Sequence, residues 1–191
     1  MEIVKANRMG IAKAVKILQG GGTVVYPTDT AYALGGIFNS RKAANKILKI
    51  KERRDPKFTL VASSFEQVKK NFNLNRGQIS LAKKYWPSAL SIVVSKKFAV
   101  RVPDNQVARA LAKGVDKPMI ATSANLSGQK TLYHSREIIR QFKNKKNVPD
   151  LLLDAGALKR IEVSTIVVVK KDKAEILRQG SVRLAAAAKV K

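Results

Sequence analysis

Helical and strand-like patterns of apolar residues alternate along most of the chain. The first helix is predicted from four apolar residues at the i, i+3, i+4, i+7 spacing of an amphipathic helix: Ile11, Ala14, Val15 and Leu18. The glycines at 20–22 end this helix, and residues 23–26 predict a buried strand closed by Pro27. The same criteria predict further strands at residues 58–62, 90–95, 98–102, 119–121, 151–153, 165–169 and 174–177.

Helix boundaries are marked by capping residues and by proline. A second helix starts near Ser40, and Ser63 with Glu66 has the spacing of a capping box for a third. A fourth runs from about residue 76 to Trp86-Pro87, because proline cannot continue a helix. Asp104 is expected to cap a short helix that buries three apolar residues and ends at 114, and Ser135 to open the last one. The buried residues of the short helix are expected to be Val107, Ala110 and Leu111.

The order of these elements predicts one α/β domain with a mixed, twisted sheet. No Pro/Gly/Ser-rich linker divides the chain, and no internal repeat is evident. The loop at 170–173 between the last two strands suggests a hairpin.

Composition removes several classes of chemistry. The 191 residues include no cysteine and one histidine, His134, so a disulfide framework, a Cys-ligated zinc and a Ser-His relay are not expected, and no metal site is predicted. The longest apolar runs are four or five residues, too short to cross a membrane, and the N-terminus lacks the apolar segment of a signal peptide. We therefore expect a cytoplasmic protein.

The net charge of +25 is spread from Lys5 to Lys191 rather than gathered in one tail. Such a surface attracts polyanions such as nucleic acid, nucleotides and pyrophosphate. A general basic bias that keeps the protein soluble accounts for many of these lysines equally well. Charge alone therefore establishes neither specific binding nor catalysis.

Three polar segments follow predicted strands, where ligands bind in open α/β sheets. Tyr26-Pro27-Thr28-Asp29-Thr30 either binds a small polar ligand or forms a turn that satisfies its own backbone. The segment 51–57 continues a cationic helix face that suits a triphosphate or is simply solvated. The segment 121–128 either contacts phosphate or ribose or is a self-satisfied loop. The residues of the cationic helix face are Lys42, Lys46, Lys49 and Arg53.

Together these segments resemble the YrdC-like family, the threonylcarbamoyl-AMP synthases of tRNA modification. The matching pieces span about residues 10–181 in the family's order, with residues 182–191 as a basic C-terminal tail. They are Tyr26-Pro-Thr-Asp-Thr, Lys51-x-Arg53 with Lys57, Trp86-Pro87, Ala99-Val-Arg101-Val-Pro103, Thr122-Ser-Ala-Asn125-Leu-Ser-Gly128, Ser164-Thr165 and Leu177-Arg178-Gln-Gly180.

The resemblance implies a single YrdC-like domain, residues 1–191, whose sheet and helices surround a basic concave cavity. It implies that L-threonine, bicarbonate or CO₂, and ATP give threonylcarbamoyl-AMP and pyrophosphate, with Mg²⁺ arriving on the ATP. Partner proteins then transfer the threonylcarbamoyl group to the adenosine beside the anticodon of tRNAs reading codons that begin with A. The chain resembles the family's short form, without the extra C-terminal domain.

The resemblance also assigns roles to individual residues. Thr30, Arg101 and Ser164 match threonine-binding positions; Arg53, Lys57, Ser123, Asn125 and Arg178 match ATP-binding positions. Lys51 and Arg53 are the expected catalytic cations, because charge develops on phosphoryl oxygens and the leaving group. Asp29 is the only base suggested for the threonine amine.

Two other functions remain open at this point. A double-stranded RNA- or tRNA-binding module would use a basic concave face without catalysis, although 6% aromatic residues offer few stacking platforms. A carbamoyl-adenylate-forming domain of hydrogenase maturation would be accompanied by larger domains with Cys motifs, which this chain lacks. The chain departs from the family at Ala33 and Ser88, where glycine is common, at Asn105, where histidine is common, and in a short segment between Ser95 and Phe98.

Overall fold

The strands and helices alternate along the chain in the computed structural model, which describes residues 1–53, 55, 57–170 and 173–184. Within these residues the helices are α1 (Arg8–Gln19), α2 (Arg41–Lys51), α3 (Phe65–Asn71), α4 (Arg76–Tyr85), α5 (Gln106–Gly114) and α6 (Ser135–Phe142). The strands are β1 (Glu2–Lys5), β2 (Val24–Pro27), β3 (Tyr32–Gly35), β4 (Phe58–Val61), β5 (Leu90–Val93), β6 (Phe98–Arg101), β7 (Met119–Ile120), β8 (Thr122–Ser123), β9 (Leu151–Asp154), β10 (Thr165–Lys170) and β11 (Lys173–Arg178).

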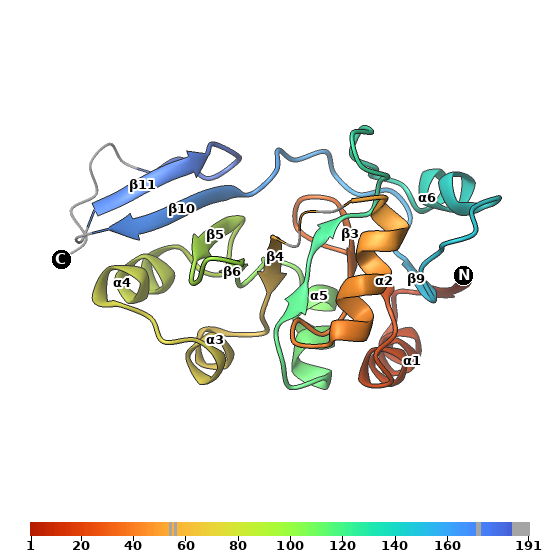
Figure 1. Cartoon of the computed structure of the whole chain (residues 1–191), viewed down its shortest axis with the longest axis horizontal. Helices are drawn as coiled ribbons and strands as arrows, with labels where there is room; N and C mark the ends of the chain where they lie inside the picture. The colour runs from red at the N-terminus through yellow and green to blue at the C-terminus, as the bar shows by residue number, and fades with distance from the viewer. Residues whose placement is uncertain (54, 56, 171–172, 185–191) are drawn as a thin grey trace.

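These strands form two mixed sheets rather than the single sheet predicted. One has the order β1-β9-β2-β3-β8 and the other β11-β10-β5-β6-β4-β7. Figure 1 shows β10, β11 and α4 at one end of the molecule and α1, α2 and α6 at the other. The α/β class and the mixed strand directions are confirmed, and the division into two sheets is the correction.

One short segment, residues 119–123, belongs to both sheets. β7 pairs antiparallel with β4, whereas β8, one residue further on, pairs antiparallel with β3. Tyr26 supports this crossing from β2, because its hydroxyl donates to the Ile120 carbonyl over 2.9 Å. The carbonyl of Gly36 accepts the Ile120 N–H at 2.8 Å, so the crossing is tied to the first sheet as well. The two sheets are therefore held at a fixed angle around this segment.

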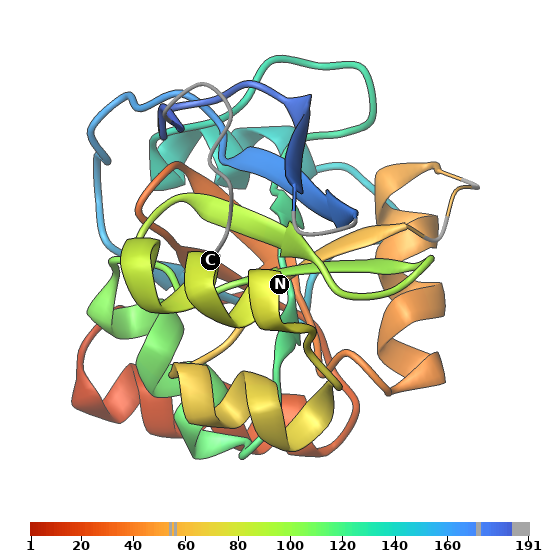
Figure 2. The ribbon, with the colours of Figure 1, turned by 90° about the vertical axis from the view of Figure 1, so that its left-hand side faces the viewer.

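Apolar faces of the helices cover both sheets. α1 and α5 pack together through Ala14, Leu18, Ala108 and Leu111 against the first sheet. α4 lies in front of the second sheet in Figure 2, where Leu81 joins Leu90, Ile92 and Val167 of β5 and β10. The predicted amphipathic faces of these helices thus supply the core.

Two helix starts differ by one residue from the prediction. Ser64, not Ser63, caps α3, since its hydroxyl accepts the Gln67 N–H. Asn105, not Asp104, caps α5, and its amide oxygen accepts the Ala108 N–H at 3.0 Å.

The buried face of α5 also differs from the prediction, and the strand list is incomplete. Ala108, Leu111 and Ala112 are the buried residues of α5, while Val107 and Ala110 are half-buried. β1, β3 and β8 were not predicted. The hairpin of β10 and β11 is confirmed by antiparallel pairing, although residues 171 and 172 of its loop lie outside the described residues. No helix within the described ranges is long and apolar enough to cross a membrane.

Candidate active site

A cavity of ≈ 590 Å³ lies between the two sheets, a volume typical of small-molecule sites. The second sheet contributes Thr59 of β4 with Ala99 and Arg101 of β6, among others, and the first sheet contributes Ala33 and Ser123. Thr59 and Ala99 are paired across β4 and β6 and are small, so they leave space above the sheet. The hollow is thus formed by both sheets together.

The turn after β2 satisfies its own backbone and also places a hydroxyl group at the cavity wall. The Thr28 hydroxyl accepts the N–H groups of Thr30 and Ala31, each at 3.2 Å, and donates to the Ala31 carbonyl at 2.7 Å. This turn holds the Thr30 hydroxyl 3.1 Å from Nη2 of Arg101. The two alternatives weighed for this segment are therefore compatible, since the self-satisfied turn positions Thr30 in the cavity.

Arg101 is a buried cation with unused hydrogen-bond donors. Its side chain is 5% exposed, and its Nη2 lies 2.9 Å from Oδ1 of Asp29 in an ion pair. Its Nε and Nη1 have no partner among the described residues. Burial lowers the pKa of the Arg101 guanidinium from its ordinary value, and the Asp29 charge opposes that shift. Arg101 also lines the cavity, and a guanidinium in such a site is suited to bind a carboxylate.

Asp29 is the partner of Arg101 and does not line the cavity. Its second oxygen accepts the Asp104 N–H at 3.1 Å, which ties the turn after β2 to the segment after β6. Because both carboxylate oxygens are engaged in this way, the placement argues for a positioning role rather than the general-base role suggested from sequence.

Ser164 and Arg178 meet at the same end of the cavity. Nη2 of Arg178 donates to the Ser164 carbonyl at 2.8 Å and to its hydroxyl at 3.0 Å, and the Ser164 hydroxyl also lies 3.1 Å from that of Ser91. Burial lowers the pKa of Arg178, and the charge of nearby Arg101 lowers it further. Two guanidinium groups that disfavour each other's charge attract an anion between them.

Lys51 lies behind the segment 121–128 and does not line the cavity. It is 4% exposed, and its Nζ donates to the carbonyls of Ser123 and Asn125, both at 2.6 Å, with the Asn125 amide oxygen at 3.2 Å. Burial, with a smaller effect from Arg53, lowers its pKa to about 8. Lys51 therefore fixes the backbone that presents Ser123 to the cavity, while the Asn125 side chain stays outside it.

Arg53 and Lys57 do line the cavity. The Arg53 guanidinium lies 5.5 Å from the centre of the Phe58 ring and 3.8 Å from Asp55, and it donates to the Lys57 carbonyl. This contact joins the end of α2 to the start of β4. The two predicted nucleotide-binding cations are thus adjacent.

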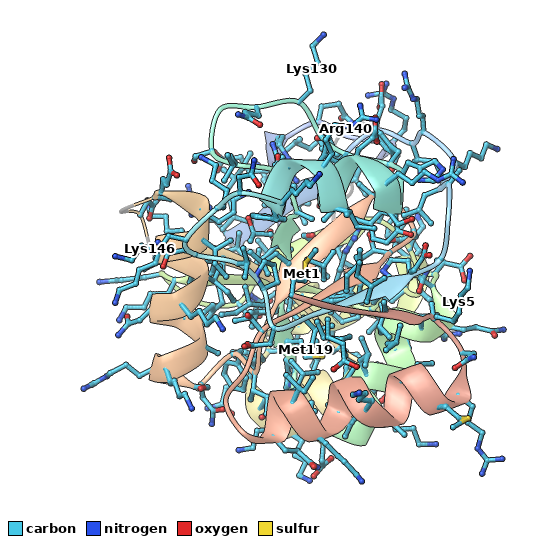
Figure 3. The ribbon with its side chains drawn as sticks, turned by 90° about the vertical axis from the view of Figure 1, so that its right-hand side faces the viewer. Met1, Lys5, Met119, Lys130, Arg140 and Lys146 are labelled. Atoms are coloured by element: carbon cyan, nitrogen blue, oxygen red, sulfur yellow. The ribbon has the colours of Figure 1, made fainter. Side chains whose placement is uncertain are left out.

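Many other basic side chains lie away from the cavity. On α2, Lys42 donates to the Gly20 carbonyl and Lys46 pairs with Asp150, so only Arg53 of the predicted cationic face reaches it. At the far end of the molecule, Lys130 and Lys146 extend outward (Figure 3). These side chains therefore fit the interpretation that many of the basic residues are surface charges rather than ligand-binding groups.

Sequence reasoning missed several residues that line the cavity. Tyr133 and Ile161 come from segments without regular structure, and Lys96 and Lys97 come from the turn between β5 and β6. The short segment after Ser95 was noted as a departure, and its two adjacent lysines were the available signal. Of the residues that do line the cavity within the described ranges, none is acidic.

The fold and the site define an α/β protein with a basic cavity between two mixed sheets, able to hold a small ligand that carries several negative charges. A family model described as Sua5/YciO/YrdC, telomere recombination, matches residues 16–180. The chain belongs to this family, which confirms the resemblance recognised from its motifs.

Two relatives of known sequence are similar to most of this chain, and one of them is named as an enzyme. The chain is 35% identical over 159 residues to a threonylcarbamoyl-AMP synthase of Psychromonas ingrahamii, covering 74% of this chain and 83% of the relative. It is also 30% identical to the uncharacterized protein YciO of Escherichia coli, covering 89% and 88%.

Two solved structures share the fold closely. Sua5 of P. abyssi in complex with L-threonine has a TM-score of 0.82 at 25% identity and covers 94% of this chain. The chain spans 56% of the length of that Sua5 chain. The crystal structure of E. coli YciO has a TM-score of 0.80 at 26% identity and covers 94% of both chains.

Proposed function

We propose that the protein synthesises L-threonylcarbamoyl-AMP from L-threonine, bicarbonate or CO₂, and ATP, with release of pyrophosphate. The observation that carries the proposal is the buried Arg101, which lines a cavity without acidic lining residues among those described and whose Nη2 lies 3.1 Å from the Thr30 hydroxyl. The name of the P. ingrahamii relative and the threonine in the P. abyssi Sua5 structure support the same assignment.

Threonine is placed with its carboxylate at the Arg101 end. A guanidinium offers a carboxylate paired, charge-assisted hydrogen bonds, and the hydroxyls of Thr30 and Ser164 lie on nearby segments of the same cavity. The neutral threonine amine attacks CO₂: a nitrogen–carbon bond forms as one carbon–oxygen π bond opens, and the nitrogen then loses a proton to water to give a carbamate anion.

The carbamate then attacks the α-phosphorus of ATP. A new oxygen–phosphorus bond forms as the bond between the α-phosphorus and the bridging oxygen breaks, and pyrophosphate leaves with the electron pair. Arg53 and Lys57 stabilise the charge on the leaving group, and Ser123 contacts the nucleotide. Lys51 acts through Ser123 and Asn125, whose backbone it holds. Arg178 contributes charge between the two substrates, and Mg²⁺ arrives bound to the phosphates of ATP.

The product is a mixed anhydride of a carbamate and a phosphate, a reactive acyl donor. We propose that it is consumed by proteins that transfer the threonylcarbamoyl group to the adenosine beside the anticodon of tRNAs reading codons that begin with A. Weak contact of the basic surface with tRNA is part of the same proposal.

The test is pyrophosphate release by the purified chain, with threonine, bicarbonate or ATP omitted in turn. We expect release only when all three are present. Arg53→Ala should abolish it with the fold intact, whereas Lys49→Ala, which changes an exposed lysine of α2 outside the cavity, should not.

Release that does not depend on threonine would exclude the synthase. If Arg53→Ala binds RNA as tightly as the unmodified chain and neither releases pyrophosphate, the protein is an RNA-binding module.

A further inference from the structure

The turn between β5 and β6 is a short, well-fixed connection that presents two lysines. The N–H groups of Val94 and Ser95 both donate to the Phe98 carbonyl, at 3.0 and 3.2 Å. The Ser95 hydroxyl accepts the N–H groups of Lys97 and Phe98, at 3.3 and 3.1 Å. Lys96 and Lys97 are exposed and both line the cavity, so the turn holds two ammonium groups at its mouth.

Two further cations lie beside this turn. β4 and β6 run parallel with Phe58 opposite Phe98, and the Phe58 N–H donates to the Lys97 carbonyl at 3.1 Å. Lys57 therefore precedes β4 next to the position where Lys97 precedes β6. Arg53 donates to the Lys57 carbonyl, which brings the end of α2 to the same place. Four cations from three segments gather at the N-terminal ends of these strands.

β6 separates this group from the arginines at the other end of the cavity. Residues 97, 99 and 101 alternate along one face of the strand and all line the cavity. Four residue steps along a strand span about 13 Å, so the backbone positions of Lys97 and Arg101 are that far apart. Ala99 and Thr59 lie between them and leave the path open. The cavity thus has two cationic ends.

A threonine carbamate aligned for in-line attack on the α-phosphorus of ATP has this span. Summing bond lengths of about 1.3–1.5 Å from the threonine carboxylate through the carbamate places the α-phosphorus roughly 6–7 Å away, and each further phosphorus adds roughly 3 Å. With the carboxylate at Arg101, the β- and γ-phosphates therefore reach the Lys97 end.

We propose that Lys96 and Lys97, with Lys57 and Arg53, form the subsite for the pyrophosphate part of the nucleotide. This assignment rests on the proposed function. It gives the β5–β6 turn a role in binding ATP and in stabilising the pyrophosphate that leaves.

The experiment compares Lys96→Ala/Lys97→Ala with Lys83→Ala/Lys84→Ala, an exposed pair on α4 that changes the net charge equally but does not line the cavity. Binding of inorganic pyrophosphate, ATP and AMP to the purified chain is measured by calorimetry at one salt concentration. We expect the first variant to weaken pyrophosphate and ATP binding about ten-fold, with AMP unchanged, because two exposed charge pairs contribute about 1.4 kcal/mol. The control variant should match the unmodified chain.

Equal weakening of AMP and pyrophosphate, equal effects of both variants, or a loss confined to RNA binding would each overturn the subsite. A chain that binds pyrophosphate through Lys96 and Lys97 but shows no threonine-dependent turnover would overturn the proposed function and leave the subsite standing. Threonine-dependent turnover, together with an unchanged pyrophosphate affinity of Lys96→Ala/Lys97→Ala, would overturn the subsite and leave the proposed function standing.

Discussion

Removing either member of the Asp29–Arg101 ion pair should destabilise the protein strongly. The two side chains are 10% and 5% exposed and lie 2.9 Å apart, so a single replacement leaves a buried charge without its partner. Such a loss costs about 3–5 kcal/mol, a large part of the roughly 5–15 kcal/mol that stabilises a typical domain. We expect Asp29→Ala and Arg101→Ala each to lower the free energy of unfolding by about that amount.

The double variant separates the pair from its surroundings. With both charges gone, no unpaired ion remains, so Asp29→Ala/Arg101→Ala should lose less than the sum of the single losses. The expected coupling energy is about 2–3 kcal/mol, obtained from urea denaturation of the four proteins at pH 7.

Lys170 and Glu175 provide a control of equal separation and different burial. Their charged atoms also lie 2.9 Å apart, but the side chains are 67% and 56% exposed, and an exposed pair contributes about 0.5 kcal/mol. If the two cycles give the same coupling energy, burial does not determine the strength of the pair at Asp29, and the reasoning fails.

Two further predictions concern a buried lysine and a close backbone approach. The pKa of Lys51 is lowered from 10.5 to about 8. Between these two pH values the unfolded chain therefore binds more protons than the folded chain, so the free energy of unfolding rises with pH. The full cost of burying the charged lysine is present below pH 8 and is lost as the pH rises toward 10.5. NMR titration of the Lys51 side chain should give the lowered pKa, and a measured pKa at or above 10 contradicts the prediction. The free energy of unfolding of the unmodified chain should rise by roughly 3 kcal/mol over that pH range, and this rise should be absent in Lys51→Met. A Cβ on Gly35 would lie 1.9 Å from the Ile120 carbonyl oxygen, so Gly35→Ala should lower the free energy of unfolding, measured by thermal denaturation, by about 1–3 kcal/mol. A Cβ on Gly20 has its nearest atom at 3.5 Å, so Gly20→Ala should be close to neutral. Equal losses in the two variants would show that the contact at Gly35 does not constrain the backbone.

The helices were predictable because their signals are local. Apolar spacing located α1, and proline at 87 located the end of α4. The predicted caps of α3 and α5 are each one residue too early, because two adjacent residues of the capping type occur at the start of each helix. At α5 the Asn105 side chain accepts the Ala108 N–H, while the N–H of Asp104 donates to Asp29 of a distant segment.

The division into two sheets was not predictable from local patterns. Residues 119–123 look like one short strand, and only the positions of β4 and β3 determine that Ile120 pairs with one sheet and Thr122 with the other. β3 is only four residues long and closely follows the polar segment that ends at Thr30, and β1 is mostly exposed and shows no clear alternation. These strands are defined by their partners rather than by their own residues.

The site was predicted by resemblance more than by spacing. Thr30, Arg101 and Ser164 come from three distant segments, and no local rule brings them together. Lys51 is the last residue of α2, and the left-handed conformation of Glu52 turns the chain away from the helix before Arg53. One is therefore buried beneath the segment 121–128 while the other lines the cavity.

The departures from the family pattern have unequal consequences once they are placed in the fold. Asn105 caps α5 and does not line the cavity, so this departure falls on a helix cap rather than on the cavity wall. The N–H of Ser88 donates to the Val102 carbonyl, and its buried hydroxyl, also outside the cavity, has no partner in the part of the chain that the structure describes. Ala33 is different, because it lines the cavity and is paired with Ser123 across β3 and β8. Its methyl group narrows the space beside a predicted nucleotide-binding residue, so any difference in substrate affinity between this chain and its relatives should originate at Ala33 and at the β5–β6 turn.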